Sequence, residues 1–187
     1  MRKAEATRER ILDAATAEFA QYGIAGARVE RIAKAAAGNK NLIYMYFGSK
    51  EQLLETVLNR NLRKVYEVVP FTPEDLPGYT GRLFDFAMEH PDLMRLMAWF
   101  GLERQGAGLA ERQATFTVKL RAMSKAQKDG IIRSDFTPAF ILTVITTMAS
   151  AWTSVNPFGN AINPHALKHQ RALRNSVMQL VREMTTR

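Results

Sequence analysis

The stretch Asn39-Lys-Asn-Leu-Ile-Tyr-Met-Tyr-Phe-Gly-Ser-Lys50 combines apolar anchors with side chains suited to phosphates and base edges. Asn39 is a good helix N-cap, and the helix that follows places Ile43 and Phe47, four residues apart, on one face. Ser49, with a glutamine three residues later, has the spacing of a capping box and predicts the start of a second helix. Two helix starts so close together are typical of the end of a helix-turn-helix. We therefore interpret the stretch as a DNA-recognition helix and the beginning of its supporting helix.

Apolar residues recur at helical spacing on both sides of this stretch. Before it, the pattern predicts an amphipathic helix over about residues 6–22, ended by Gly23, and a short helix over residues 29–36. After it, a helix is expected over about residues 50–68, followed by a turn-rich linker at residues 71–78.

The helical pattern continues beyond the linker to the end of the chain. We expect five further helices, with loops at residues 106–108 and 156–163 and helix boundaries at about 79–89, 91–103, 109–129, 137–155 and 163–184. No run with the alternation of a β-strand is long enough to predict a sheet. The sequence therefore predicts an all-α protein of about nine helices.

The chain of 187 residues carries a net charge of +8 and has a pI near 10.0, which favours a polyanionic partner. Residues 1–67 and residues 68–187 each carry +4, although the first part is little more than half as long, so positive charge is denser at the N-terminus. The absence of cysteine excludes disulfides, thiolate nucleophiles and cysteine-ligated metals. The N-terminus lacks the apolar core of a signal peptide, and the most apolar run, residues 136–155, contains too many threonines and serines for a membrane span. We expect a soluble cytoplasmic protein.

Three spaced motifs at the N-terminus resemble the helix-turn-helix signature of the TetR family of bacterial transcription regulators. They are Phe19-x-x-x-Gly23, Val29-x-x-Ile32-Ala33-x-x-Ala36 and Ile43-Tyr44-x-Tyr46-Phe47-x-Ser49-Lys50, in that order. The match covers roughly residues 8–54. The resemblance implies a DNA-binding domain at residues 1–60 and a larger helical ligand-binding and dimerisation domain at residues 61–187.

The chain departs from this signature where the family contacts DNA, so the operator sequence does not carry over. The family often has threonine or serine before its second helix, where this chain has Ala27-Arg28, and its usual Gly-Thr in the recognition helix is here Asn41-Leu42. Lys40 and Asn41 are our candidates for base edges. The full predicted DNA-binding set is Arg28, Asn39, Lys40, Asn41, Tyr44, Tyr46 and Lys50. Arg28 is either a phosphate clamp or a solvated charge, and the tyrosines either contact phosphates or pack inside.

Methionine and aromatic residues are frequent in the C-terminal part, where they suit either an ordinary core or the wall of an apolar ligand pocket. The resemblance implies an inducer cavity there. Our candidate ligand-binding residues are Met94, Met97, Trp99, Phe100, Phe116, Met123, Met148 and Trp152.

The last two long helices have apolar residues on more than one side, so we expect a second subunit to cover one side. The predicted dimer interface consists of Phe140, Val144, Val155, Leu173, Val177, Leu180, Val181 and Met184. A two-fold dimer would also place two recognition helices about 34 Å apart, as a pseudo-palindromic operator requires.

Patterns typical of enzymes are lacking: His165 and His169 have no nearby carboxylates, and no nucleophile elbow or glycine-rich phosphate loop occurs. We expect no enzyme activity, no cofactor, no metal site and no membrane partner. Our hypothesis is a homodimeric repressor that binds double-stranded operator DNA and is released by a small apolar or aromatic effector. Two alternatives stay open: a regulator without a small-molecule inducer, and a helical small-molecule-binding protein whose helix-turn-helix is vestigial.

Overall fold

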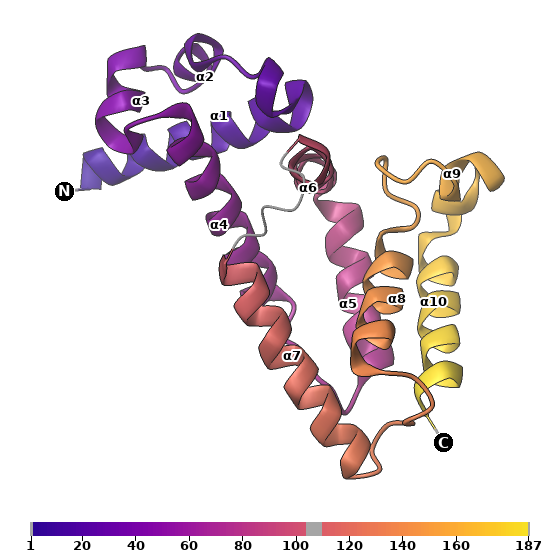
Figure 1. Ribbon diagram of the computed structural model, residues 1–187. Coiled ribbons are helices and arrows are strands. Elements are labelled where there is room, and N and C mark those ends of the chain that lie inside the picture. Colours follow the sequence, from indigo (N-terminus) through magenta and orange to yellow (C-terminus); the bar gives the residue numbers. More distant parts are fainter. Residues whose placement is uncertain (1, 104–109, 187) are drawn as a thin grey trace. The chain divides into compact units, whose positions relative to one another are not determined.

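The computed structural model describes residues 2–103 and 110–186, and within these ranges it contains helices and no strands (Figure 1). The all-α prediction is therefore confirmed. In chain order the helices are α1 (Arg2–Gly26), α2 (Val29–Ala35), α3 (Lys40–Phe47), α4 (Lys50–Val68), α5 (Leu76–Glu89), α6 (Pro91–Glu103), α7 (Ala110–Lys128), α8 (Pro138–Ser150), α9 (Gly159–Ile162), a short 3₁₀ helix η1 (Ala166–His169) and α10 (Gln170–Thr185). The predicted loop at residues 106–108 and the start of its helix at residue 109 lie outside the described residues. Within those ranges, no helix combines the length and the apolarity that crossing a membrane requires.

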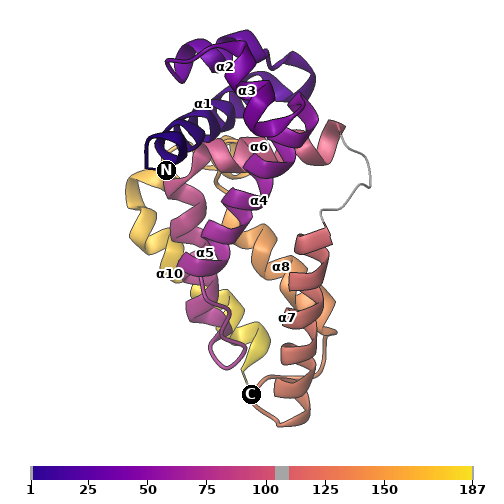
Figure 2. The same cartoon turned by 90° about the vertical axis from the view of Figure 1, so that its left-hand side faces the viewer.

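The chain divides into two compact units, one within Met1–Lys64 and Asp92–Ala107 and the other within Val65–Pro91 and Gly108–Arg187. The first unit contains α1, α2, α3, most of α4 and α6, which Figure 2 shows together. The second contains α5, α7, α8, α9 and α10. We describe each unit by itself.

The core of the first unit forms where α1, α2, α3 and α4 turn their apolar faces toward one another. Phe19, Ile32, Ile43 and Leu54 are all buried, one from each helix. Burying a side chain of this size contributes about 1.5–3 kcal/mol, so these four residues explain much of why such short helices are stable.

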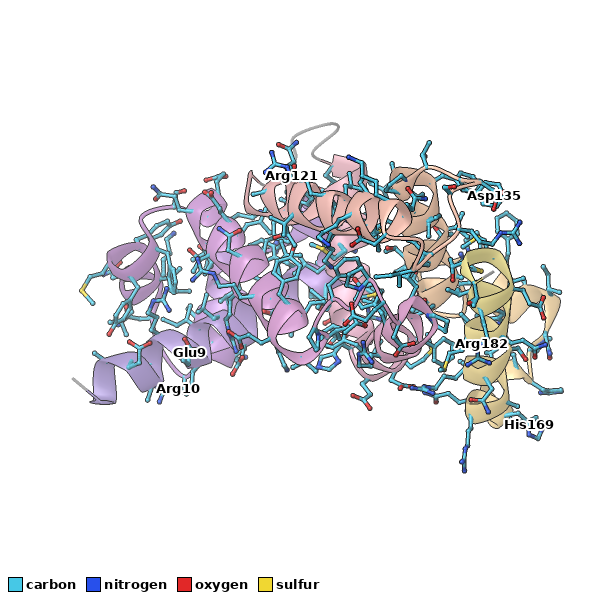
Figure 3. All side chains as sticks on the ribbon, turned by 90° about the horizontal axis from the view of Figure 1, so that it is seen from below. Glu9, Arg10, Arg121, Asp135, His169 and Arg182 are labelled. Atoms are coloured by element: carbon cyan, nitrogen blue, oxygen red, sulfur yellow. The ribbon has the colours of Figure 1, made fainter. Side chains whose placement is uncertain are left out.

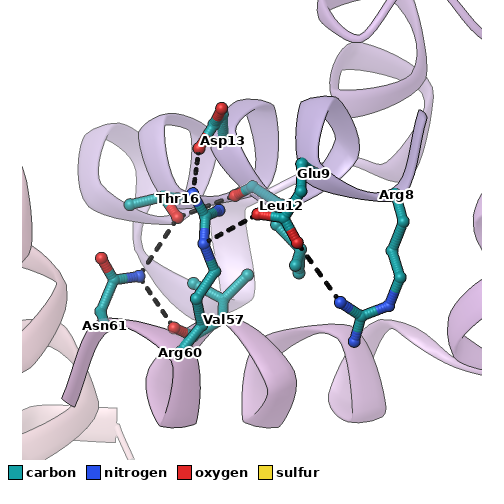
Figure 4. A network of polar contacts seen from close by, with 8 residues as sticks. All are labelled: Arg8, Glu9, Leu12, Asp13, Thr16, Val57, Arg60 and Asn61. Atoms are coloured by element: carbon teal, nitrogen blue, oxygen red, sulfur yellow. Dashed lines mark hydrogen bonds and ion pairs between the residues drawn. The ribbon is translucent and has the colours of Figure 1, made fainter. Parts of the chain in front are cut away.

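Polar contacts join the outer side of α1 to α4 (Figure 4). The Arg60 guanidinium lies 2.5 Å from Asp13 Oδ1 and 3.3 Å from Glu9 Oε2. One turn away, Asn61 Nδ2 donates to the backbone oxygen of Val57 at 2.8 Å and to the Thr16 hydroxyl at 3.4 Å. These contacts fix the register of α4 on α1.

In the second unit α5, α8 and α10 run side by side (Figure 1), and α7 also packs on α8. Phe84, Ile141, Ile145 and Val181 are buried between these helices. Arg174 on α10 donates to Asp85 on α5 at 2.7 Å. Arg121 on α7 and Arg182 on α10, which Figure 3 labels, are exposed.

A lysine is buried in this second unit. Lys119 on α7 is 9% exposed, and its ammonium donates to the Tyr79 hydroxyl at 2.8 Å. The same ammonium lies 5.4 Å from the ring centre of Tyr66, 5.5 Å from that of Phe71 and 5.2 Å from that of Tyr79. Burial lowers the pKa of Lys119 to about 8 and raises the pKa of Tyr79 to about 12. The aromatic faces stabilise the charge only partly, because they do not replace water around it.

Several helix boundaries differ from the prediction, each for a local reason. α5 begins at Leu76, inside the predicted linker, because Asp75 caps it and a proline is tolerated in the first turn. α8 ends at Ser150, five residues earlier than predicted. There the Thr153 hydroxyl donates a hydrogen bond to the Ser150 carbonyl at 2.7 Å. The predicted loop at 156–163 contains the short helix α9, and the predicted last helix is split into η1 and α10.

Candidate nucleic-acid interface

The ends of α3 are fixed by the side chains that the sequence predicted. Asn39 Oδ1 accepts a hydrogen bond from the backbone N–H of Leu42 at 3.0 Å, which satisfies one free donor of the first turn. Ser49 Oγ accepts from the backbone N–H of Gln52 at 3.1 Å and caps α4 in the same way. Between them Gly48 adopts φ +77°, a conformation that other residues rarely take. Both predicted caps are confirmed.

The two faces of α3 separate core from surface. Ile43 and Phe47 are buried, as predicted. Lys40, Asn41 and Tyr44 are exposed, so the residues proposed for DNA do share the outer side of the helix. Tyr46 is half-buried, and its ring is tilted against Phe47 with the ring centres 6.2 Å apart.

Met45 also lies on the outer side and is 68% exposed. The sequence analysis did not select it because it has neither a charge nor a hydrogen-bond donor. Its spacing could have revealed it, since residue 45 is four residues from Asn41 and lies opposite the buried pair at 43 and 47.

Lys40 is paired in the free protein. Its ammonium lies 3.0 Å from Glu30 Oε1 on α2. The hydrogen bond between them lowers the pKa of Glu30 and raises the pKa of Lys40, so both stay charged at neutral pH. Both side chains are largely exposed, so water and salt weaken the pair and the ammonium is free to exchange partners.

The missing cap of α2 is replaced by a carboxylate from α1. Arg28 occupies the N-cap position without a side-chain cap, and its own side chain is exposed. Glu18, which is buried, accepts hydrogen bonds from the backbone N–H of Arg28 and from Nε of Arg31, each at 2.8 Å. The Arg31 guanidinium lies 4.0 Å above the Tyr22 ring. The departure at Ala27-Arg28 therefore removes a local cap, and Glu18 satisfies the backbone N–H of Arg28 from another helix.

The kinked end of α1 is held by α6 and by Lys50. Gly23 produces a kink, with φ +73°, where the sequence predicted the helix to end, and the chain continues helically to Gly26. Glu103 at the end of α6 accepts from the backbone N–H groups of Ile24 at 2.8 Å and Ala25 at 2.7 Å. A Cβ on Gly23 would lie 2.6 Å from Glu103 Oε1 and 3.1 Å from the Trp99 ring. Lys50 Nζ donates to the Ala25 carbonyl at 3.3 Å, which places this predicted DNA contact at the same turn.

The predicted ligand-binding residues fall in both units. Those on α6 belong to the first unit: Met94, Met97, Trp99 and Phe100. Those from α7 onward belong to the second: Phe116, Met123, Met148 and Trp152. Met123 is fully buried in the protein core.

A groove of about 320 Å³ lies between α7 and α8, within the second unit. Phe116 and Leu142 provide apolar walls, and the Arg112 guanidinium lies 5.4 Å from the ring centre of Phe116. Of the eight predicted ligand residues, Phe116 lines this groove. The rest of its lining is Leu120, Ala139, Thr143, Thr146 and Thr147.

The residues predicted for a dimer interface divide by exposure. Phe140 and Leu180 are half-exposed, at 50% and 53%, and Val155 is exposed too. Val144, Leu173 and Met184 are intermediate. Val177 and Val181 are buried within the chain itself, because the face of α10 that carries them packs on α5, so we leave them out of the proposed interface.

Comparison with known proteins matches both parts of the chain. Residues 11–57 match the family described as bacterial regulatory proteins, tetR family, and residues 75–183 match the tetracyclin repressor-like C-terminal domain. The HTH-type transcriptional repressor SCO4008 of Streptomyces coelicolor is 42% identical over 83% of this chain and 82% of its own length. The HTH-type transcriptional repressor NicS of Pseudomonas putida is 31% identical over 70% of this chain and 62% of its own length.

Solved structures agree with these sequence matches. SCO4942 from Streptomyces coelicolor is 38% identical, with a TM-score of 0.83 over 96% of this chain and 98% of its own. A TetR family regulator from Marinobacter aquaeolei VT8 is 20% identical, with a TM-score of 0.76 over 99% of this chain and 98% of its own, and shows the same fold. The matched relatives are regulators of transcription and not enzymes. Family matches at both ends and a close relative over most of the length lead to one conclusion: this chain belongs to the TetR family and is a DNA-binding transcriptional regulator.

Proposed function

We propose that the protein is a repressor that binds a pseudo-palindromic operator as a homodimer and is released by a small apolar or aromatic effector. The observation that carries the DNA part is the outer side of α3, where Lys40, Asn41 and Tyr44 are exposed on a helix capped at both ends. The width of an α-helix such as α3 suits the major groove of B-DNA. The sign of regulation follows the relatives whose names describe them as repressors.

Each proposed DNA contact has a chemical role. Lys40 and Asn41 would contact base edges at the start of the helix, with Asn41 suited to adenine. Tyr44, Tyr46 and Lys50 would bind phosphates, and Arg28 would do so from the start of α2. Asn39 acts through its cap, which orients the first turn.

The DNA part is tested by selecting bound fragments from a random pool and measuring affinity for the selected site. Binding should weaken as salt rises, and Lys40→Ala should weaken it at any one salt concentration. Tyr46→Phe should weaken binding if its hydroxyl contacts a phosphate. Lys168→Ala, which removes an exposed lysine from the C-terminal unit, is the matched control and should leave affinity unchanged. Failure to retain any fragment would refute the proposal.

The effector part rests on the α7–α8 groove, whose apolar walls and single guanidinium suit a small, largely apolar molecule. An effector acts only if it binds the DNA-competent and the released conformations with different affinities. Trp152 and Trp99 allow binding to be followed by fluorescence. A panel of apolar compounds should contain at least one that changes this fluorescence and releases DNA, with Phe116→Ala weakening both effects. If no compound does either, a regulator without a small-molecule inducer is the better description.

The homodimer is proposed from the exposed apolar side chains of α8 and α10. Phe140→Glu or Leu180→Glu should lower the mass in sedimentation from dimer to monomer and weaken operator binding, because a single half-site provides less binding energy. Val118→Glu is the control, since Val118 is a similarly exposed apolar residue on α7. A wild-type monomer at micromolar concentration would contradict the interface.

A further inference from the structure

We propose that Met45 is a specificity-determining residue, which packs against the C5-methyl group of a thymine when α3 enters the major groove. This inference rests on the proposed binding of DNA through α3. It concerns a side chain that has no place among the charged and polar contacts described above.

Met45 lies on the face of α3 opposite the buried pair Ile43 and Phe47. An α-helix turns about 100° per residue, so residue 45 lies about 180° from the midpoint between Ile43 and Phe47. Those two residues are buried and Met45 is 68% exposed, as this geometry requires. The same geometry places Asn41, one turn earlier, beside Met45 on the outermost strip of the helix. Asn41 and Met45 therefore lie on the strip of α3 that faces directly away from the buried pair.

The chemistry of the side chain carries the second step. A thioether has no hydrogen to donate and is a weak acceptor, so Met45 is a poor partner for a phosphate. Among the base edges in the major groove, the group that matches an apolar, flexible side chain is the thymine methyl. The neighbouring Asn41 has the amide that binds adenine. The pair would thus favour a step in the half-site that contains an adenine and a thymine.

The expected effect is modest and measurable. Burying one methyl group contributes about 0.8 kcal/mol, which corresponds to about a four-fold change in affinity. The effect should be confined to one position of each half-site, because one side chain contacts one methyl group.

Deoxyuridine supplies the test, since it differs from thymidine only in lacking this methyl group. The operator is first obtained by selection with the wild-type protein, and each thymine of one half-site is then replaced in turn by deoxyuridine. Affinity is measured by fluorescence anisotropy at fixed salt. We expect one position at which the replacement weakens wild-type binding about four-fold.

The variant Met45→Ala should bind the thymine operator more weakly and should bind the thymine and deoxyuridine forms at that position equally well. Val118→Ala, which removes a similarly exposed apolar side chain from α7, should keep the wild-type sensitivity. Circular dichroism of the variants confirms that α3 is still folded. A half-site without thymine, a wild type insensitive at every position, or a Met45→Ala variant as sensitive as the wild type would each overturn the inference while leaving operator binding intact. A protein that retains no DNA would instead overturn the proposed function on which the inference rests.

Discussion

The buried lysine of the second unit makes stability depend on pH in a defined direction. The pKa of Lys119 falls from an ordinary value of 10.5 to about 8 because the ammonium is removed from water. Between these two values the unfolded chain keeps a proton that the folded chain has lost, so the free energy of unfolding rises with pH. Below pH 8 both states are protonated, and the folded state pays the full cost of a buried charge.

The size of the effect follows from the two pKa values. At about 1.4 kcal/mol per pH unit, burying the charged lysine costs about 3 kcal/mol at pH 7. Raising the pH to 9.5 should recover about 2 kcal/mol of this. The measurement stays below pH 10 because the pKa of Tyr79, raised to about 12, makes stability fall again above the pKa of an unfolded tyrosine.

Lys119→Met isolates the contribution, because it keeps the volume and removes the charge. We expect urea unfolding of the wild type to gain about 2 kcal/mol between pH 7 and pH 9.5 relative to this variant. The comparison uses the pH dependence, since the absolute stability also includes the loss of the hydrogen bond to Tyr79, about 1 kcal/mol. A Trp99→Phe background leaves Trp152, in the same unit as Lys119, as the fluorescent reporter.

The matched control is Lys128→Met, which removes an exposed lysine from the same helix and should keep the wild-type pH dependence. Stability curves that run parallel for the wild type and Lys119→Met from pH 7 to pH 9.5 would refute the lowered pKa of Lys119.

Three further substitutions test the first unit. Glu18→Ala removes the carboxylate that accepts from the start of α2 and should lower the free energy of unfolding by about 1–2 kcal/mol, measured by thermal denaturation. Glu5→Ala, on an exposed part of α1, the helix that also carries Glu18, should have little effect. Gly23→Ala should lower the free energy of unfolding by about 1–3 kcal/mol, because φ +73° with ψ 179° is a conformation that essentially only glycine adopts. The new methyl group would also meet Glu103 and the Trp99 ring and should shift the Trp99 emission; an unchanged spectrum and stability would contradict the kink. Ile43→Ala should lower the free energy of unfolding by about 2–5 kcal/mol, because it leaves a cavity in the core. Tyr44→Ala, on the exposed side of α3, should lower it much less. Equal losses would mean that the buried and exposed faces of α3 are assigned wrongly.

Features set by neighbours along the chain could be predicted from the sequence. The caps Asn39 and Ser49 act on N–H groups three residues away, and the spacing of Ile43 and Phe47 selects the buried face whatever they pack against. The same reasoning located the start of α8, where the Thr137 hydroxyl accepts from the N–H of Phe140.

Features set by distant partners could not be predicted in this way. The carboxylate that accepts from the backbone N–H at the start of α2 comes from Glu18 on another helix. The backbone N–H of Ile24, just after the kink of α1, donates to Glu103 at the end of α6. An apolar stripe also does not say which partner covers it: Val177 and Val181 were expected to contact a second subunit, and both are buried within the chain itself. The end of α8 was misplaced because hydroxyl groups near Ser150 compete for carbonyls that a longer helix would use.

The ion pair between Glu30 and Lys40 has a consequence for how the protein would search a chromosome. A solvated lysine gains a new partner at any phosphate it meets, whereas Lys40 must first leave Glu30 and so exchanges one partner for another. Contact with arbitrary DNA then gains less from this side chain than its charge suggests. Because the chromosome offers a vast excess of wrong sites, weaker attraction to each of them leaves more of the protein available for the operator. Lys40 must leave Glu30 at the operator as well, so the ion pair favours the operator only to the extent that Lys40 gains more from a base edge there than from a phosphate elsewhere.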